Sequence, residues 1–97
     1  MRERANDQSI RSYRDLREWK EAMDLAVECY GLTEGFPKDE TFGLTSQIRR
    51  AASSVPANIA EGYGRDSAGH YVNFLRTAQG SLKELETHLL LSNRKWM

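Results

Sequence analysis

The feature that most limits how this chain can fold is a seven-residue apolar repeat in its C-terminal third. The repeat consists of Tyr71, Leu75, Ala78, Leu82, Leu85 and Leu89, and Trp96 falls in the same register. Spacings of three and four residues put these side chains on one face of an α-helix, whereas a strand would alternate with a period of two. The pattern predicts a helix over residues 67–96, and Ser67 is a suitable N-cap residue for it.

Two earlier segments show the same spacing. The first predicts a helix over residues 14–34, with Leu16, Trp19, Met23, Ala26, Tyr30 and Thr33 on its main face. Ser12 and Asp15 fit a capping box at its start, and Asp15 with Glu18 offers a second start three residues later. Gly35 and Pro37 follow its end, where a helix commonly stops.

The second segment predicts a helix over residues 41–64. Its apolar face consists of Leu44, Ile48, Ala51, Ala52, Val55 and Ile59. Pro56 removes one backbone donor, but the apolar spacing continues past it, so we expect one bent helix. Gly62 and Gly64 then end the pattern.

A chain of 97 residues is one domain. We expect residues 1–11 to form a flexible arm and residues 12–97 to form the helical domain. Strand-like alternation is absent from the sequence, and the predicted loops are short. The fold class we predict is all-α: an antiparallel up-down bundle of three long helices.

Composition excludes several classes of protein. The 14 basic and 14 acidic residues balance, which disfavours binding to nucleic acid or membranes by bulk charge. No apolar run approaches the roughly 18 residues of a transmembrane helix. The first twelve residues do not resemble a secretory signal, and the single cysteine fits a reducing compartment. We therefore expect a cytoplasmic protein with no membrane partner.

The sequence also lacks a recognisable catalytic or metal-binding constellation. Glu84 and His88 are four residues apart, but His70 lies 18 residues from His88 on the same predicted helix. Cys29 has no nearby feature that would lower its pKa. There is no Gly-x-Ser-x-Gly motif and no glycine-rich phosphate loop. We predict no enzyme activity, no metal and no cofactor.

Apolar residues also occur outside the predicted core stripes. On the first helix these are Leu25, Cys29 and Leu32, and on the third they include Val72 and Leu90. They are either incidental surface residues or the interface of a homo-oligomer. We favour the interface, because the apolar arc of the first helix is wider than a surface helix needs.

Charge is unevenly distributed along the chain. Residues 21–48 carry one basic and six acidic residues, whereas residues 49–97 carry seven basic and four acidic ones. The two regions either pair between subunits or form ordinary solvated surface. The candidate contacts to nucleic acid are Arg49, Arg50, Arg65, Arg76 and Lys83. The alternative is a solvated or salt-bridged face, since Glu61 and Arg65 are spaced to pair.

Two segments resemble a known family. Residues 43–52 and 54–64 read Gly-Leu-Thr-Ser-Gln-Ile-Arg-Arg-Ala-Ala and Ser-Val-Pro-Ala-Asn-Ile-Ala-Glu-Gly-Tyr-Gly. Phe74-Leu75, Ala78, Gly80-Ser81-Leu82, Glu84-Leu85-Glu86-Thr87 and, upstream, Asp15-Leu16 and Trp19 add to them. Over about residues 13–91 the chain resembles the four-helix-bundle family named for proteins encoded in 23S rRNA intervening sequences.

The resemblance implies a small cytosolic bacterial protein with an antiparallel bundle, often a ring-like pentamer, and no known enzymatic activity. A related branch, the accessory variability proteins of diversity-generating retroelements, forms basic pentameric barrels that bind nucleic acid and a reverse transcriptase. The balanced charge of this chain differs from that branch. The chain also departs from the family at His70, where similar sequences often have an acidic residue in the first turn of this helix.

Family members usually continue into a fourth helix, whereas this chain stops at Met97. We expect the fourth helix to be missing or supplied by a partner, leaving a groove lined by residues such as Leu82, Leu85 and Leu89. Either another chain fills that groove or the natural protein is longer. The function we predict is that of a non-catalytic homo-oligomeric scaffold or accessory factor. The alternative is an accessory protein that binds RNA or DNA.

Overall fold

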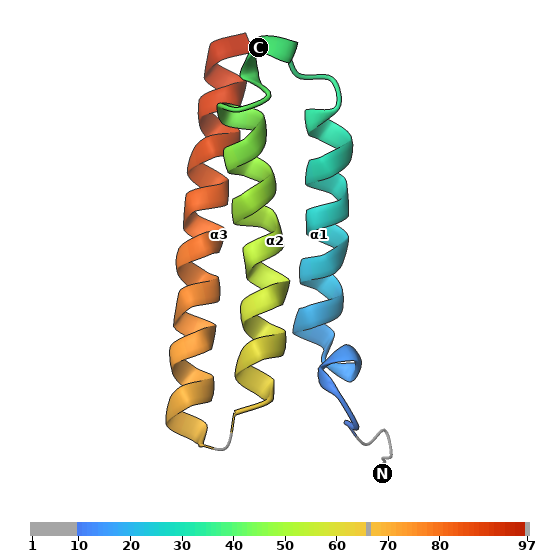
Figure 1. Ribbon diagram of the computed structural model, residues 1–97, viewed down its shortest axis with the longest axis vertical. Helices are drawn as coiled ribbons and strands as arrows, with labels where there is room; N and C mark the ends of the chain where they lie inside the picture. The colour runs from blue at the N-terminus through green and yellow to red at the C-terminus, as the bar shows by residue number, and fades with distance from the viewer. Residues whose placement is uncertain (1–9, 66, 97) are drawn as a thin grey trace.

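The computed structural model describes residues 10–65 and 67–96, and all regular structure among them is helical. The long helices are α1 (Arg17–Thr33), α2 (Leu44–Tyr63) and α3 (Ala68–Trp96). Two short 3-10 turns, η1 (Tyr13–Asp15) and η2 (Lys38–Glu40), precede α1 and α2. Figure 1 shows the three helices running alternately up, down and up. The predicted all-α class with three long helices is confirmed. Of the arm predicted over residues 1–11, residues 1–9 lie outside the described residues.

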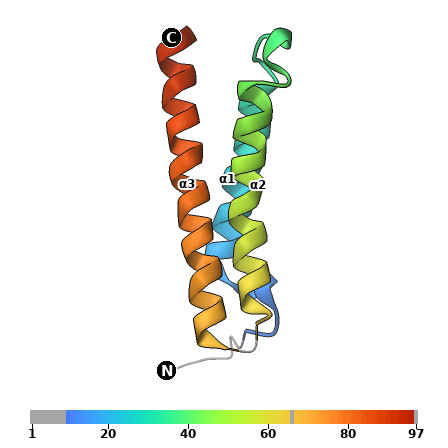
Figure 2. The same ribbon diagram turned by 60° about the vertical axis from the view of Figure 1, so that its left-hand side comes forward.

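Helix α2 is the centre of the arrangement. It packs against both α1 and α3, whereas no Cα atom of α1 lies within 8 Å of a Cα atom of α3. Figures 1 and 2 together show α1 and α3 on different sides of α2. The molecule measures 50 × 26 × 18 Å along its principal axes. The outer helices are therefore held together mainly through α2, with an open space between them.

The start of α1 differs from its predicted position. The capping box of Ser12 and Asp15 is present, but it closes the separate turn η1. Leu16 then takes an extended conformation and buries its side chain, so α1 begins at Arg17. The side chains of Ser12 and Asp15 accept hydrogen bonds from backbone N–H groups of this single 3-10 turn. The extended backbone of Leu16 then separates the turn from α1.

Helix α2 is continuous through Pro56, as the uninterrupted apolar spacing predicts. Near its C-terminal end it approaches α3 closely at Gly62. A Cβ atom at this position would lie 2.7 Å from the Cβ of Phe74 and 3.1 Å from Cδ1 of Tyr71. The absence of a side chain at residue 62 therefore sets how closely the two helices approach.

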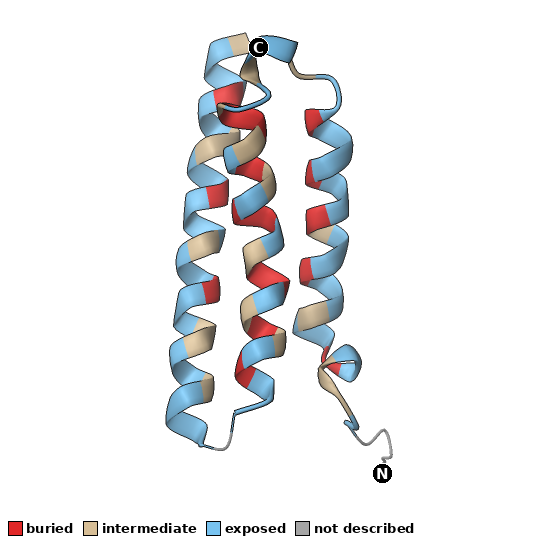
Figure 3. Ribbon diagram, in the orientation of Figure 1, coloured by how far each residue is buried: buried red, intermediate tan, exposed pale blue. Residues whose placement is uncertain are grey.

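The core forms where α2 faces its two neighbours (Figure 3). One cluster of buried residues consists of Ala26, Cys29, Leu44, Ile48, Ala51, Ala52 and Leu85. The other consists of Leu16, Ala22, Val55, Ile59 and Ala78. Ile48 and Leu85 are the largest side chains that are almost fully buried. The alanines leave space for the backbones to approach closely.

The buried face of α1 is rotated from the predicted one. Met23 and Tyr30 were expected in the core but are 39% and 44% exposed. Ala22 and Cys29 are buried beside Ala26 instead. The physical reason is that α1 packs chiefly on α2, and its small side chains allow a close approach that larger ones would block.

Candidate interaction surfaces

A long groove lies between α1 and α3. Its upper part, about 780 Å³, is lined by Leu25, Gln79, Leu82, Lys83, Leu85, Glu86, Leu89, Leu90 and Asn93. A second part of about 370 Å³ shares Leu25, Gln79 and Leu82 with the first. The second part continues along Glu18, Glu21, Ala22, Val55, Ile59, Leu75 and Ala78. Leu82, Leu85 and Leu89 therefore line the groove, as the sequence predicts. We call this continuous surface the α1–α3 groove.

The five predicted interface residues do not share one environment. Leu25 and Leu90 line the α1–α3 groove. Leu32 and Val72 are exposed elsewhere on the same two helices. Cys29 is only 3% exposed and packs inside its own chain's core. Its position is explained by the core of one chain, without a partner.

The sequence pattern predicted one part of the exposed apolar surface and missed another. Leu82 belongs to the seven-residue repeat yet is 44% exposed, because no neighbouring helix covers that side of α3. A second apolar groove, with a volume of about 500 Å³, lies between α1 and α2. It is lined by Trp19, Met23, Val27 and Tyr30 on α1 and by residues of α2 that include Ala57 and Ala60. The wide apolar arc of α1 indicated that some of its apolar residues would be exposed. It did not indicate which side of the arc packs against α2.

Arg49 connects α2 to the end of α1. Its Nε donates a hydrogen bond of 2.8 Å to Oγ1 of Thr33, and Nη2 donates one of 3.4 Å to the carbonyl of Tyr30. The guanidinium also lies 4.7 Å from the centre of the Tyr30 ring. A cation here is favoured by the partial negative charge at the end of α1. Arg49 therefore has a structural role within its own chain.

Arg65 also makes contacts within its own chain. It forms an ion pair with Glu61, four residues earlier, as the spacing predicts. Its guanidinium lies 5.0 Å from the centre of the Phe74 ring on α3. Both contacts hold Arg65 near the turn between α2 and α3.

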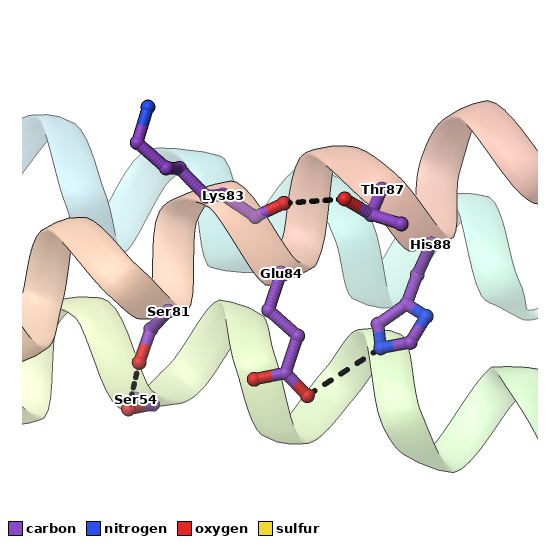
Figure 4. A network of polar contacts seen from close by, with 6 residues as sticks. All are labelled: Ser54, Ser81, Lys83, Glu84, Thr87 and His88. Atoms are coloured by element: carbon purple, nitrogen blue, oxygen red, sulfur yellow. Dashed lines mark hydrogen bonds and ion pairs between the residues drawn. The ribbon is translucent and has the colours of Figure 1, made fainter.

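Arg50 borders a polar cleft of about 260 Å³ between α2 and α3. Beside it, Ser54 and Ser81 share a hydrogen bond of 2.7 Å across the two helices. Asn58 donates to Oγ of Ser54 over 3.0 Å. Figure 4 shows this pair and, further along α3, the 3.4 Å contact between His88 Nε2 and Glu84. The serine hydroxyls and the Asn58 amide are used to join and order the helices.

Arg76 and Lys83 lie on α3, and both are exposed. Lys83 borders the α1–α3 groove. Of the five predicted basic contacts, Arg49 thus faces α1, Arg50 faces the cleft between α2 and α3, and Arg65 lies near one end. The structure does not bring the five into a single patch.

The remaining candidate groups for chemistry are few. Burial raises the pKa of the Cys29 thiol above its ordinary value, with a further contribution from the charge of Glu28. Within residues 10–65 and 67–96, no three His, Cys, Asp or Glu side chains are grouped so that they could hold a metal ion. In the same ranges no helix has the length and apolarity needed to cross a bilayer.

A comparison with protein families gives one result. The family model described as 23S rRNA-intervening sequence protein matches residues 14–96. This match covers all three helices and the segments between them. No match among curated proteins was found for the chain.

Proposed function

Because the chain belongs to the family of 23S rRNA-intervening sequence proteins, we propose that it acts as a non-catalytic, homo-oligomeric scaffold or accessory factor. The observation that carries the proposal is the α1–α3 groove. Leu82 and Leu90 are 44% and 58% exposed there, and Leu25 lies opposite them. Covering a large apolar side chain contributes about 1.5–3 kcal/mol. A second subunit that supplies the fourth member of a bundle would gain this free energy.

A role without catalysis is supported by how the reactive side chains are used. The Cys29 thiol is buried and its pKa is raised, which disfavours the nucleophilic thiolate. The hydroxyls of Ser54 and Ser81 form a hydrogen bond with each other. We also propose a cytoplasmic location, which fits a single buried thiol.

The test is the native mass of the full chain. Light scattering at micromolar concentration is expected to show a stable oligomer, and the resemblance suggests five copies. A monomer at that concentration would contradict the proposal. Circular dichroism on the same sample confirms that the protein is folded.

The second candidate function is binding of RNA or DNA by the assembled oligomer. The specific support is Arg50, which is exposed beside a polar cleft whose rim also carries Gln47 and Ser54. Repetition of this residue around an oligomer would add phosphate contacts that one copy lacks. The related retroelement branch of the resemblance points the same way.

Fluorescence anisotropy with labelled RNA and DNA tests this function at low and raised salt. Binding is expected to weaken as salt rises, because each phosphate contact releases counterions. Arg50→Ala is expected to weaken binding on many sequences alike, whereas Lys20→Ala on α1 serves as the matched control. Absence of binding at low salt, or binding insensitive to salt, would reject the function.

A further inference from the structure

The polar cleft between α2 and α3 differs in character from the two apolar grooves. Its volume is about 260 Å³, and it is lined by Gln47, Arg50, Ala51, Ser54, Ser81 and Glu84. Among the described residues that line it, none is aromatic and none is a large apolar side chain. A ligand of this cleft is therefore held by charge and hydrogen bonds, and not by stacking on a ring.

Two opposite charges line the cleft from different helices. Arg50 lies on α2 and is exposed, and Glu84 lies on α3 with 58% of its side chain exposed. Within residues 10–65 and 67–96, no ion pair joins Arg50 to Glu84 or to any other carboxylate. The guanidinium of Arg50 therefore remains available to an anionic ligand.

One oxygen of the Glu84 carboxylate is also available. Its Oε2 contacts Nε2 of His88 over 3.4 Å. Oε1 has no hydrogen-bond donor within the part of the chain that the structure describes. In Figure 4 it points along α3 away from His88, in the direction of Ser54 and Ser81. The cleft thus contains a charged acceptor as well as a charged donor.

The two serine hydroxyls supply a further donor. Ser54 and Ser81 share one hydrogen bond of 2.7 Å, and Asn58 donates to Oγ of Ser54. The shared bond uses one of the two hydroxyl hydrogens. Among the described residues the other hydrogen has no acceptor, whichever serine donates to its neighbour. Both serines are only half-buried, so this hydrogen is available to a ligand.

This arrangement suits a ligand that carries an anionic group and a hydroxyl close together. A phosphate oxygen accepts from Arg50 and from a serine hydroxyl, whereas Glu84 needs a donor. The backbone of RNA supplies both, since each ribose carries a 2′-hydroxyl beside its phosphate. DNA lacks that hydroxyl. With DNA in the cleft, the Glu84 carboxylate would face phosphate charge without a compensating hydrogen bond.

We propose that the polar cleft binds the sugar–phosphate backbone of RNA in preference to DNA, with a phosphate on Arg50 and a ribose 2′-hydroxyl donating to Glu84. This inference rests on the proposed binding of nucleic acid and names which of the two nucleic acids the site selects. Contacts to phosphate and sugar carry no direct sequence information. Binding is therefore expected to be nearly independent of base sequence.

Two oligonucleotides that differ only in the 2′-hydroxyl test the preference. Labelled oligo(U) and oligo(dU) of equal length carry the same bases and the same charge. Fluorescence anisotropy with the full chain at low salt is expected to give a dissociation constant about tenfold lower for oligo(U), the factor for one hydrogen bond to a charged group. Oligo(U) with 2′-O-methyl groups should bind as weakly as oligo(dU), because a methoxy group cannot donate.

Glu84→Ala removes the acceptor and is expected to make the two dissociation constants nearly equal. Glu86→Ala is the matched control, since it removes the same charge from an exposed position of α3 that lines the α1–α3 groove. It should leave the preference for oligo(U) unchanged. Arg50→Ala is expected to weaken both oligonucleotides by the same factor, because both carry the phosphate. Circular dichroism confirms that every variant folds.

The outcomes separate this inference from the proposed function. Equal binding of oligo(U) and oligo(dU) by the unmodified protein would overturn the preference and leave nucleic-acid binding standing. Absence of binding by either at low salt would overturn both. A folded Glu84→Ala variant that keeps the preference, or that weakens both oligonucleotides equally, would show that Glu84 does not contact the ribose.

Discussion

At the scale of single residues, buried polar contacts hold the ends of the helices in place. Thr33 is buried, and its hydroxyl donates to the carbonyl of Cys29 over 2.8 Å while it accepts from Arg49. The apolar pattern of α1 places Thr33 correctly on the buried face. The sequence did not indicate that Arg49 would use it as a partner, because the two residues are 16 positions apart.

We expect Thr33→Val to destabilise the protein by about 1–2 kcal/mol, because Arg49 loses an acceptor in a partly buried position. Arg49→Met should cost a similar amount, and the double variant should cost less than the two together. Urea unfolding measures the three values. Thr87→Val on the exposed side of α3 is the control and should change stability by less than about 0.5 kcal/mol. Strict additivity of Thr33→Val and Arg49→Met would show that the contact contributes nothing.

Glu40 joins three parts of the chain. The backbone N–H of Leu44 and then the ammonium of Lys95 donate to its carboxylate, and together they hold its pKa below the ordinary value of 4.5. A carboxylate with a depressed folded-state pKa stabilises the protein above its unfolded-state pKa. That contribution is lost as the pH falls through the depressed value.

Glu40→Gln is therefore expected to lower the urea midpoint at pH 7, with a difference from the unmodified protein that shrinks as the pH falls below 4.5. Urea unfolding between pH 7 and pH 3 measures this difference. Asp24→Asn, an exposed change on α1, is the control and should alter neither midpoint nor slope appreciably. A Glu40→Gln difference that stayed constant over the whole pH range would show that the charge is not involved.

At the scale of helices, close approach depends on residues without large side chains. Gly62 is buried against Phe74 and Tyr71, whereas a Cβ on Gly80 in the middle of α3 would have no neighbour within 4 Å outside the adjacent backbone of its own helix. The sequence pattern predicted that Gly62 and Gly64 end the helix. Its contact with α3 became visible only when the two helices were placed together.

The two glycines should respond in opposite directions to alanine. Gly62→Ala is expected to destabilise by about 1–3 kcal/mol, since the added methyl group overlaps the Cβ of Phe74. Gly80→Ala is expected to stabilise by about 0.5–1 kcal/mol through helix propensity alone. Thermal unfolding compares both with the unmodified protein. A stabilising Gly62→Ala would mean that α2 and α3 separate easily at this end.

At the scale of the whole molecule, the structure is open on one side. Helix α2 packs against both neighbours, but α1 and α3 leave the groove that exposes Leu82 and Leu90. A protein whose core is completed by a second copy is stabilised by association, so its stability depends on concentration.

The melting temperature is accordingly expected to rise with protein concentration from the nanomolar to the micromolar range. Leu82→Gln should reduce this dependence, because it removes apolar area from the centre of the groove while leaving the intrachain core of Ile48 and Leu85 intact. Fluorescence-monitored melting over that range gives the measurement. Gln47→Ala, exposed on α2, is the control. A melting temperature independent of concentration would show that the protomer is stable alone.

The sequence by itself determined the helices, most of their core residues and the family, because apolar spacing and capping are local properties. It predicted the groove around Leu82, Leu85 and Leu89, because the resemblance implies a bundle of four helices and the apolar pattern predicts three. Only the tertiary structure decided which face of α1 is buried, since small residues such as Ala22 and Cys29 carry little apolar signal and gain their burial from close packing. Tertiary structure also decided the different roles of Arg49 and Arg50. Neighbouring side chains in a helix point about 100° apart, so Arg49 contacts α1 while Arg50 borders the cleft between α2 and α3.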